Sequence, residues 1–253
     1  MRDVLIPGQT RSMGSRRRAG LDKGEAIPGD YDSDPGRFAA NQAATQRFAA
    51  RGDVHPMVAR RLSAEGARTV VDIGGGNGLL AGHLAREDAR TVVVDRAGHV
   101  GHAPRPAVLG DALRLPFRDE SFDGAAALWM LYHLADPVLA LKEAHRVLKA
   151  GGLLAVSTVS RHNDPELAPF LPGWGKPLSF DAENGPEQLG RVFDVVDVQR
   201  WDRPMVHLAD QAAVTLFLRG RGLSEQEAPQ AAERLKPPLT ITKRGMIGWA
   251  RKR

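Results

Sequence analysis

Strand-like and helix-like segments alternate through the middle of this 253-residue chain, and this alternation constrains the fold more than any other feature of the sequence. Apolar strand patterns and helical patterns follow one another in the order 69–73, 79–87, 91–95, 107–109, 122–130, 137–150 and 152–158. Helices that connect strands of one sheet do so as right-handed crossovers, which makes the sheet parallel and covers both of its faces. The sequence therefore predicts a single α/β domain built on a largely parallel sheet.

The flanking segments extend this pattern in both directions. Before it, the spacing of apolar residues at 36–62 predicts two short helices broken around Gly52 and Pro56. After a loop rich in proline and glycine, the patterns predict strand, helix, helix and strand at 192–201, 208–219, 224–235 and 240–252. The helix that follows Asp136 is predicted to use this residue as its N-cap and to end at Gly151.

Composition narrows the class of protein. The chain has no cysteine, which excludes a disulfide framework, a thiolate nucleophile and cysteine-ligated zinc. Its longest apolar run, at 125–135, is shorter than the about 18 residues of a membrane span and contains His133. The apolar run at 4–6 is too short for the core of a signal peptide, so the sequence predicts a cytoplasmic protein without membrane contact.

Positive charge is concentrated near the N-terminus. The net charge of the chain is +5, and residues 1–20 hold five arginines against one aspartate. A basic arm rich in small residues is more often a flexible tail than a recognition element, so we expect a basic, flexible arm at 1–30. Nucleic acid is a partner that this charge permits but does not favour.

Four glycines and an asparagine lie in VVDIGGGNGLL, between a strand pattern and a helical pattern. In a parallel sheet this first strand-to-helix turn lies at the edge where ligands bind, and glycine lets the backbone approach the ligand. A dinucleotide fingerprint placed on Gly76, Gly78 and Ala81 leaves the earlier glycines unused, and the Gly-Lys-Ser/Thr of a phosphate-binding loop is absent. The register of Asp72, Gly74, Gly76 and Gly78 instead puts a carboxylate near the helix N-terminus, which favours a cationic ligand over a pyrophosphate.

Four motifs, in this order, resemble those of class I S-adenosylmethionine-dependent methyltransferases. VVDIGGGNG looks like the first motif of that family, VVVDRA like the end of its second strand, and GDALRLPFRDESFD like its adenine-contacting turn. LYHLADPVLALKEAHRVLKAGGLLAVST is similar to the subgroup that includes ubiquinone and menaquinone biosynthesis methyltransferases and many natural-product methyltransferases. The resemblance covers most of residues 69–157 and implies S-adenosylmethionine as cofactor, with S-adenosylhomocysteine as its product.

The resemblance also implies a fold and a domain organisation. The fold is a Rossmann-like, doubly wound α/β sheet of about seven strands, mostly parallel with an antiparallel last strand. Residues 31–253 are expected to form one methyltransferase domain, with an N-terminal helical lid at 31–64 and a helical insertion at about 205–237. Tyr31 and Phe38 lie in this lid and are expected to close over the cofactor.

Cofactor-binding residues follow from the same motifs. The resemblance implies this role for Asp72, Gly74, Gly76, Gly78, Asp95, Arg96, Asp111, Ala112, Leu113 and Trp129. The Asp95 carboxylate can accept hydrogen bonds from both hydroxyls of a ribose, a charge-assisted pairing that a neutral side chain does not match. Asp111 is expected to accept from the adenine amino group, while the Ala112 N–H donates to the ring and Leu113 packs against it.

The loop after the fourth strand supplies the candidate catalytic residues. Many relatives have two histidines where this chain has Tyr132 and His133. Histidine changes its charge near neutral pH, so His133 is a candidate general base for an acceptor that keeps its proton, with Tyr132 beside it. His207, expected just after the sixth strand, is a second candidate. No metal is expected, because His99 and His102 lie in a loop-like segment without placed carboxylates.

Two features of the sequence weigh against nucleic acid as the methyl acceptor. Methyltransferases that act on base amines usually carry Asn/Asp-Pro-Pro-aromatic after the fourth strand, whereas this chain has WMLYHL. Related ribosomal-RNA methyltransferases hold RNA with a cysteine-based zinc module, and this chain has no cysteine. We therefore expect a small, partly apolar metabolite, with secondary metabolism suggested by the composition. The alternatives are methylation of an RNA base and cofactor binding without catalysis.

Overall fold

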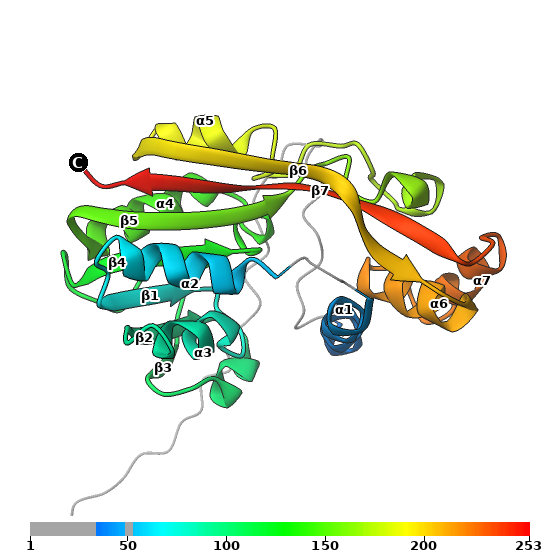
Figure 1. The fold of residues 1–253 in the computed structure, drawn as a ribbon, viewed down its shortest axis with the longest axis horizontal. Helices are drawn as coiled ribbons and strands as arrows, with labels where there is room; N and C mark the ends of the chain where they lie inside the picture. Colours follow the sequence, from blue (N-terminus) through cyan, green and yellow to red (C-terminus); the bar gives the residue numbers. More distant parts are fainter. Residues whose placement is uncertain (1–33, 49–52) are drawn as a thin grey trace, which may run out of the picture.

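Seven strands form one sheet at the centre of the molecule (Figure 1), in the order β3-β2-β1-β4-β5-β7-β6. The computed structural model describes residues 34–48 and 53–253, so the predictions for the arm at 1–30, for Tyr31 and for Gly52 lie outside the described residues. The strands are β1 (Thr69–Ile73), β2 (Arg90–Asp95), β3 (Ala107–Leu109), β4 (Phe122–Leu128), β5 (Leu148–Val159), β6 (Asp194–Leu208) and β7 (Leu239–Arg251). Strands β1 to β5 are parallel and β7 is antiparallel to β5 and β6, which confirms the predicted sheet.

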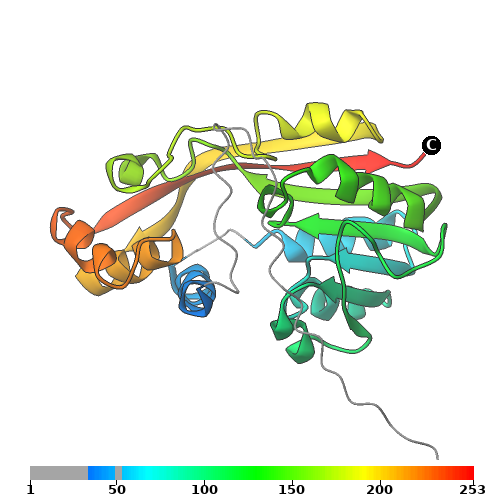
Figure 2. The same ribbon diagram turned by 180° about the vertical axis from the view of Figure 1, so that it is seen from behind.

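Helices cover both faces of the sheet. The α-helices are α1 (Pro35–Phe48), α2 (His55–Ala64), α3 (Leu79–Ala85), α4 (Pro137–Val147), α5 (Gly185–Gly190), α6 (Gln211–Gly220) and α7 (Glu227–Glu233). Three 3-10 helices are η1 (Gly98–His102), η2 (Leu131–His133) and η3 (Pro165–Phe170). Helices α2 and α3 lie on the face seen in Figure 1, and α4 and α5 lie on the face seen in Figure 2. Across residues 34–48 and 53–253, no helix has the length and apolar character that a membrane span needs.

Each face of the sheet has its own hydrophobic core. On the side of α4 and α5, Leu141 and Leu189 pack with Phe180 against the strands. On the side of α2 and α3, Leu62 and Leu84 pack with Trp249. Because the inner strands are buried on both faces, their sequences are apolar runs such as TVVDI rather than alternating patterns.

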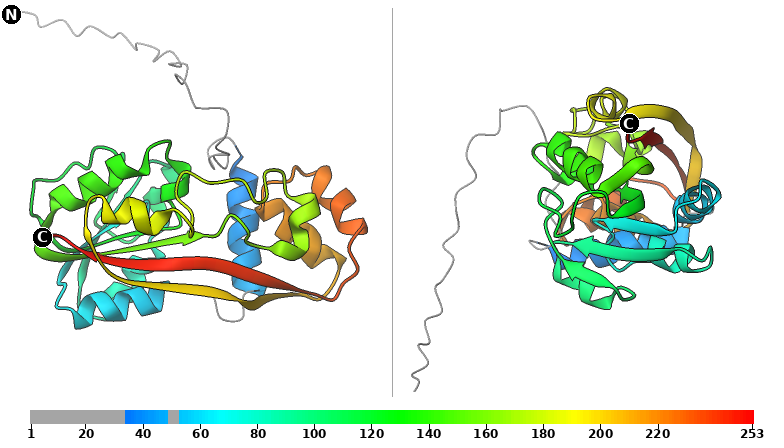
Figure 3. Two further views of the ribbon diagram at one scale, coloured as in Figure 1. Left: turned by 90° about the horizontal axis from the view of Figure 1, so that it is seen from above. Right: turned by 90° about the vertical axis from the view of Figure 1, so that its left-hand side faces the viewer.

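A third core lies away from the central sheet, at the far end of the β6–β7 hairpin (Figure 3). Strands β6 and β7 extend beyond the other strands, and α1, η3, α6 and α7 pack around their ends. This core includes Phe217 and Leu218 of α6, Ile241 of β7 and Ala44 of α1. We call this part of the molecule the head; it consists of residues 35–48, 165–170, 203–208, 211–233 and 239–243.

Ion pairs and polar contacts tie the head together. The Asp34 carboxylate, just before α1, pairs with the guanidinium of Arg219 on α6 at 2.6 Å. Asp164, which is 1% exposed, accepts from Arg221 Nε at 2.7 Å and from Lys243 Nζ at 2.5 Å. Removing one partner of Asp164 would leave an uncompensated buried charge. Together with the Asp34–Arg219 pair, these contacts fix the positions of α1, α6 and β7 relative to one another.

The structure corrects three local predictions. Helix α4 begins after its predicted cap, with Asp136 Oδ1 accepting from the Val138 N–H, but it ends at Val147 and not at Gly151. The cause is that Leu148 is fully buried and already pairs with β4. The two helices predicted at 36–62 are α1 and α2, but Pro56 lies in the first turn of α2 rather than in the break between them, a position where its missing N–H costs nothing. Strand β6 continues to Leu208, so His207 lies inside it and not after it.

Candidate functional site

The glycine loop, residues 74–78, connects β1 to α3 at the carboxyl edge of the sheet. The Gly74 N–H donates to the Val94 carbonyl of β2 at 2.7 Å, and the Gly78 N–H donates to the Gly75 carbonyl at 2.9 Å. Gly74 and Gly78 have φ of +67° and +81°, a region that residues with side chains rarely occupy. The sequence therefore uses glycine here because the turn requires it, and because Met130 and Pro104 lie so close to Gly74 and Gly78 that a Cβ would not fit.

Asp95 holds the glycine loop from the end of β2. Its Oδ2 accepts from the Gly76 N–H at 2.9 Å, and its Oδ1 accepts from the Ala97 N–H at 2.8 Å. A carboxylate has about four lone-pair sites, so Asp95 can also accept from a ligand while it makes both bonds. Arg96, the next predicted binding residue, is exposed beside it.

Asp72 lies beneath the glycine loop and is 2% exposed. Among the residues that the structure describes, its Oδ2 has no hydrogen-bond partner. A Cβ at Gly75 would overlap this carboxylate, which places it directly under the loop backbone. Burial raises the pKa of the Asp72 carboxyl to about 7; the charge of His55 lowers this pKa, and that of Asp95 raises it.

These features fit a cationic ligand. A buried polar atom without a partner is costly, and native structures contain few of them unless a ligand or ion completes the site. The carboxylate of Asp72 can receive a bound ammonium or sulfonium cation, both of which S-adenosylmethionine carries. The donor set of the loop and the two aspartates therefore fits that cofactor.

The turn after β3 holds the residues predicted to bind adenine. Asp111 is exposed, and its Oδ1 accepts from the Leu113 N–H at 2.9 Å, which leaves its other oxygen for a ligand. Ala112 is half-buried, while Leu109 is 67% and Leu113 is 39% exposed. Exposed leucines on both sides of a polar turn provide an apolar surface for a flat ring.

Trp129 has an unusual backbone conformation at the end of β4. Its φ is +59°, which is strained for a bulky side chain, and strain of this kind concentrates at functional sites. Its N–H donates to the Ser157 carbonyl of β5 at 3.0 Å, and its ring lies 5.9 Å from that of Trp201 in an edge-to-face contact. The indole thus packs with the core under α2, and contact with the cofactor stays a prediction.

The predicted catalytic residues lie on η2, which follows β4. The rings of Tyr132 and His133 are 4.5 Å apart, and both side chains are half-buried. The His133 N–H donates to the Met130 carbonyl at 3.0 Å. Their catalytic role stays a prediction. His207 is exposed on β6 in the head, paired with Thr240 of β7.

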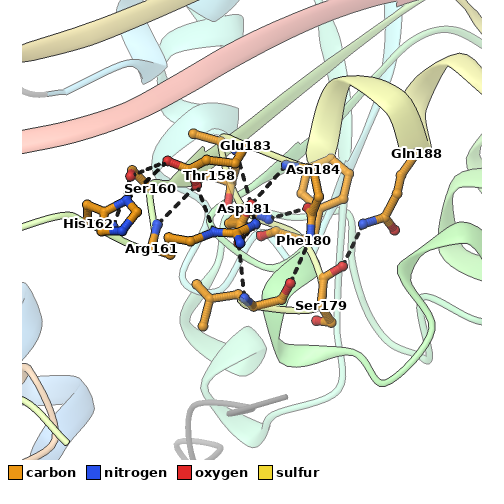
Figure 4. A network of polar contacts seen from close by, with 12 residues as sticks. Thr158, Ser160, Arg161, His162, Ser179, Phe180, Asp181, Glu183, Asn184 and Gln188 are labelled. Carbon is orange, nitrogen blue, oxygen red and sulfur yellow. Dashed lines mark hydrogen bonds and ion pairs between the residues drawn. The ribbon is translucent and has the colours of Figure 1, made fainter. Parts of the chain in front are cut away.

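Two parts of the site have no motif in the sequence. His55, at the start of α2, interacts with Asp72 through its charge, and Asp53 forms an ion pair with it. A polar network in the loop after β5, built around Asp181, also lies at the carboxyl edge of the sheet (Figure 4). Both depend on long-range packing, which no local pattern reports.

Across the described ranges, no group of three or more histidines and carboxylates is placed to hold a metal ion.

Alanine at Gly74 is expected to destabilise the protein by about 1–3 kcal/mol and to weaken cofactor binding about tenfold. The reasons are the φ of +67° and a Cβ that would lie 2.7 Å from Met130 Cγ. Gly82→Ala is the matched control, because nothing lies within 4 Å of its Cβ position and alanine favours the helix. Denaturant unfolding and calorimetric titration with S-adenosylmethionine measure both effects. Equal behaviour of the two variants would contradict the role of the loop.

Comparison with known proteins agrees with this geometry. A family described as a methyltransferase domain matches residues 71–156. Demethylmenaquinone methyltransferase of Streptomyces avermitilis is 33% identical over 119 residues, which cover 45% of this chain and 50% of that protein. The O-methyltransferase cnsE of Penicillium expansum is 32% identical over 176 residues, which cover 62% of this chain and 64% of that protein. The chain thus spans about half to two-thirds of the length of these relatives.

Solved structures support the same fold. The YcgJ protein from Bacillus subtilis has a TM-score of 0.59 at 20% identity, with 79% of this chain and 99% of that chain covered. Residues 71–156 therefore form a methyltransferase domain of the class I S-adenosylmethionine-dependent family. The domain belongs to the subgroup with ubiquinone and menaquinone biosynthesis methyltransferases. This family and fold imply S-adenosylmethionine as the methyl donor.

Proposed function

We propose that the protein transfers the methyl group of S-adenosylmethionine to a small, partly apolar metabolite. The observation that carries this proposal is the buried Asp72 carboxylate, whose Oδ2 has no hydrogen-bond partner among the described residues, beneath a glycine loop that Asp95 holds in place. Asp72 receives the positive charge of the amino acid end of the cofactor, and Asp95 receives the ribose hydroxyls. Asp111, Ala112 and the exposed leucines bind the adenine.

The bound cofactor supplies an electrophilic methyl group on a positively charged sulfur. The chain aligns the acceptor with this group and excludes water, an effect worth about 7–11 kcal/mol in well-oriented reactions. Tyr132 and His133 follow β4, next to the glycine loop, and contact the acceptor. Met130, just before η2, lies against the glycine loop, because a Cβ at Gly74 would lie within 3 Å of it.

The head closes the acceptor side of the site. Helix α1 packs on α6, and the third hydrophobic core gives the head an apolar interior. We assign the lid role predicted for 31–64 to α1, which the head carries, while α2 packs against α3 on the sheet. An aromatic or quinone-like acceptor agrees with the quinone biosynthesis enzymes among the relatives. The names of the relatives, an O-methyltransferase and quinone biosynthesis enzymes, support oxygen as the acceptor atom and biosynthesis as the setting.

A labelling experiment tests this function. Purified protein and S-adenosylmethionine with a labelled methyl group are added to extract of the source cell, and RNA, protein and small molecules are then separated. We expect label in the small-molecule fraction and none with Asp95→Ala. Label in RNA would replace the proposal by RNA methylation, with the arginines at 1–20 as its first test. Cofactor binding without any transfer would indicate a binding protein instead.

A further inference from the structure

The loop after β5, residues 160–184, lies beside η2 at the carboxyl edge of the sheet. Strands β4 and β5 are parallel neighbours, and their last paired residues are Leu128 and Ser157. The Ser179 hydroxyl donates to the Tyr132 carbonyl at 3.3 Å, so this loop packs on η2 directly. The two loops therefore pack against each other at the edge of the sheet where the acceptor binds under the proposed function.

Asp181 makes this loop rigid (Figure 4). Its carboxylate is fully buried and accepts from the backbone N–H groups of Leu178, Glu183 and Asn184 at 2.9–3.0 Å. It also pairs with the guanidinium of Arg161 at 2.8 Å. A fully satisfied buried carboxylate of this kind fixes the backbone on both sides of it, which gives the side chains that it positions a defined geometry.

His162 and Glu183 are the side chains so positioned, and Figure 4 shows them next to each other. Glu183 Oε1 lies 3.9 Å from His162 Nδ1 and accepts from the Ser160 hydroxyl at 2.5 Å. The Ser160 oxygen in turn accepts from the His162 N–H at 2.9 Å. On its other side the imidazole contacts the ring of Trp174 edge-to-face, with 5.2 Å between the ring centres.

The second nitrogen of His162 is accessible. The side chain is 45% exposed, and a Cβ at Gly175 would stand 3.8 Å from Nε2, at ordinary contact distance. Gly175 has a φ of +80°, which favours glycine, and it places no side chain beside Nε2. With the Glu183 carboxylate 3.9 Å from Nδ1, a small rotation of either side chain gives the arrangement of a general base, in which the acid orients the ring and stabilises its protonated form.

We propose that His162 accepts the proton of the methyl acceptor, with Glu183 as the residue that positions it. This inference rests on the proposed function and defines the acceptor class as a hydroxyl or N–H group that keeps its proton at neutral pH. The acceptor atom forms its bond to the methyl carbon, and the electron pair of the broken carbon–sulfur bond stays on sulfur. The acceptor's proton passes to His162 Nε2, and Glu183 balances the charge of the imidazolium.

Imidazole rescue tests this assignment with the full-length protein and the unmethylated acceptor, identified from its labelled product. His162→Ala is expected to lower kcat by about 100-fold or more, with the affinity for S-adenosylmethionine unchanged within about twofold. Added imidazole is expected to restore activity, because the half-exposed position leaves room for it. Glu183→Gln is expected to lower kcat with little change in KM. His145→Ala, on α4 beside Phe193, is the control and is expected to keep the kcat of the wild type.

The variants show whether His162 or His133 accepts the proton. If His133→Ala is the variant that imidazole rescues, or if His162→Ala keeps kcat within about threefold of the wild type, the proton goes elsewhere and this inference is wrong. Rescue of His162→Ala alone supports it, and the kcat effect of Glu183→Gln provides independent support should His162→Ala fold poorly. If the wild type labels no small molecule, the proposed function fails and this inference with it.

Discussion

Affinity for S-adenosylmethionine is expected to be about tenfold higher at pH 8 than at pH 6. Burial raises the pKa of Asp72 to about 7, so the carboxyl is mostly protonated at pH 6 and mostly ionised at pH 8 in the protein without cofactor. Only the ionised form attracts the positive charge of the cofactor. Binding therefore releases about one proton at pH 6, which calorimetry in buffers of different ionisation enthalpy measures.

The Asp72 carboxyl also makes the folding stability of the protein without cofactor depend on pH, but in the opposite direction. In the unfolded chain the carboxyl has its ordinary pKa of 3.8, whereas in the folded protein burial raises this pKa to about 7. Stability without cofactor is thus expected to fall as the pH rises from about 4 to 7, because the unfolded state releases its proton first. Asp72→Asn is expected to remove this penalty, raising the free energy of unfolding at pH 8 by up to about 4 kcal/mol.

Asp72→Asn is also expected to bind the cofactor weakly, with no pH dependence between pH 6 and pH 8. Asp111→Asn is the matched control: it changes an exposed carboxyl in the same site and is expected to keep the pH dependence of the wild type. A pH dependence that persists in Asp72→Asn would assign the effect to another group.

Asp95→Ala is expected to weaken cofactor binding by about 100-fold or more, since hydrogen bonds to a charged group contribute about 1.5–3 kcal/mol each. The variant loses the acceptor for two ribose hydroxyls. It also loses the acceptor for the Gly76 N–H, so the middle of the glycine loop loses its contact with β2, while the Gly74 N–H keeps its bond to the Val94 carbonyl. Calorimetric titration gives the affinity, and the rise in Tm with saturating cofactor gives an independent measure.

Asp95→Asn separates these two contributions. Its amide oxygen can still accept from the Gly76 or Ala97 N–H, but it has no charge and fewer free lone pairs for the diol. We expect an intermediate affinity and a glycine loop that stays in place. An Asp95→Ala variant that binds within about threefold of the wild type would rule out the ribose contact.

Much of the fold follows from local patterns. The strand at 69–73, the N-cap at Asp136 and the antiparallel strand at the C-terminus are all as predicted, because burial on both faces and helix capping act over a few residues. The end of α4 was not predictable in this way. Gly151 has the left-handed conformation of a typical helix end, but Leu148 gains more from burial beside β4 than from another helical turn.

The residues of the candidate site also differ in this respect: some could be predicted from local motifs and others could not. The glycines and Asp72, Asp95 and Asp111 lie in short motifs that follow successive strands, so their meeting at one edge follows from the parallel sheet. His162 and Glu183 are 21 positions apart and meet only because Asp181 folds the intervening loop back on itself. No spacing rule links them, and His162 has no distinguishing neighbour in the sequence.

The head and the cofactor site are built from different helices and strands of the chain. Two long strands connect the head to the sheet, and α1 joins it from the other end of the sequence through Asp34 and Arg219. Under the proposed function, evolution can therefore change the acceptor by altering the end of the β6–β7 hairpin, while the residues that bind the methyl donor stay the same. The same separation sets a rule for chimeras: a grafted hairpin end needs its own first helix, because α1 and α6 lie about 160 residues apart in the sequence but pack as one unit.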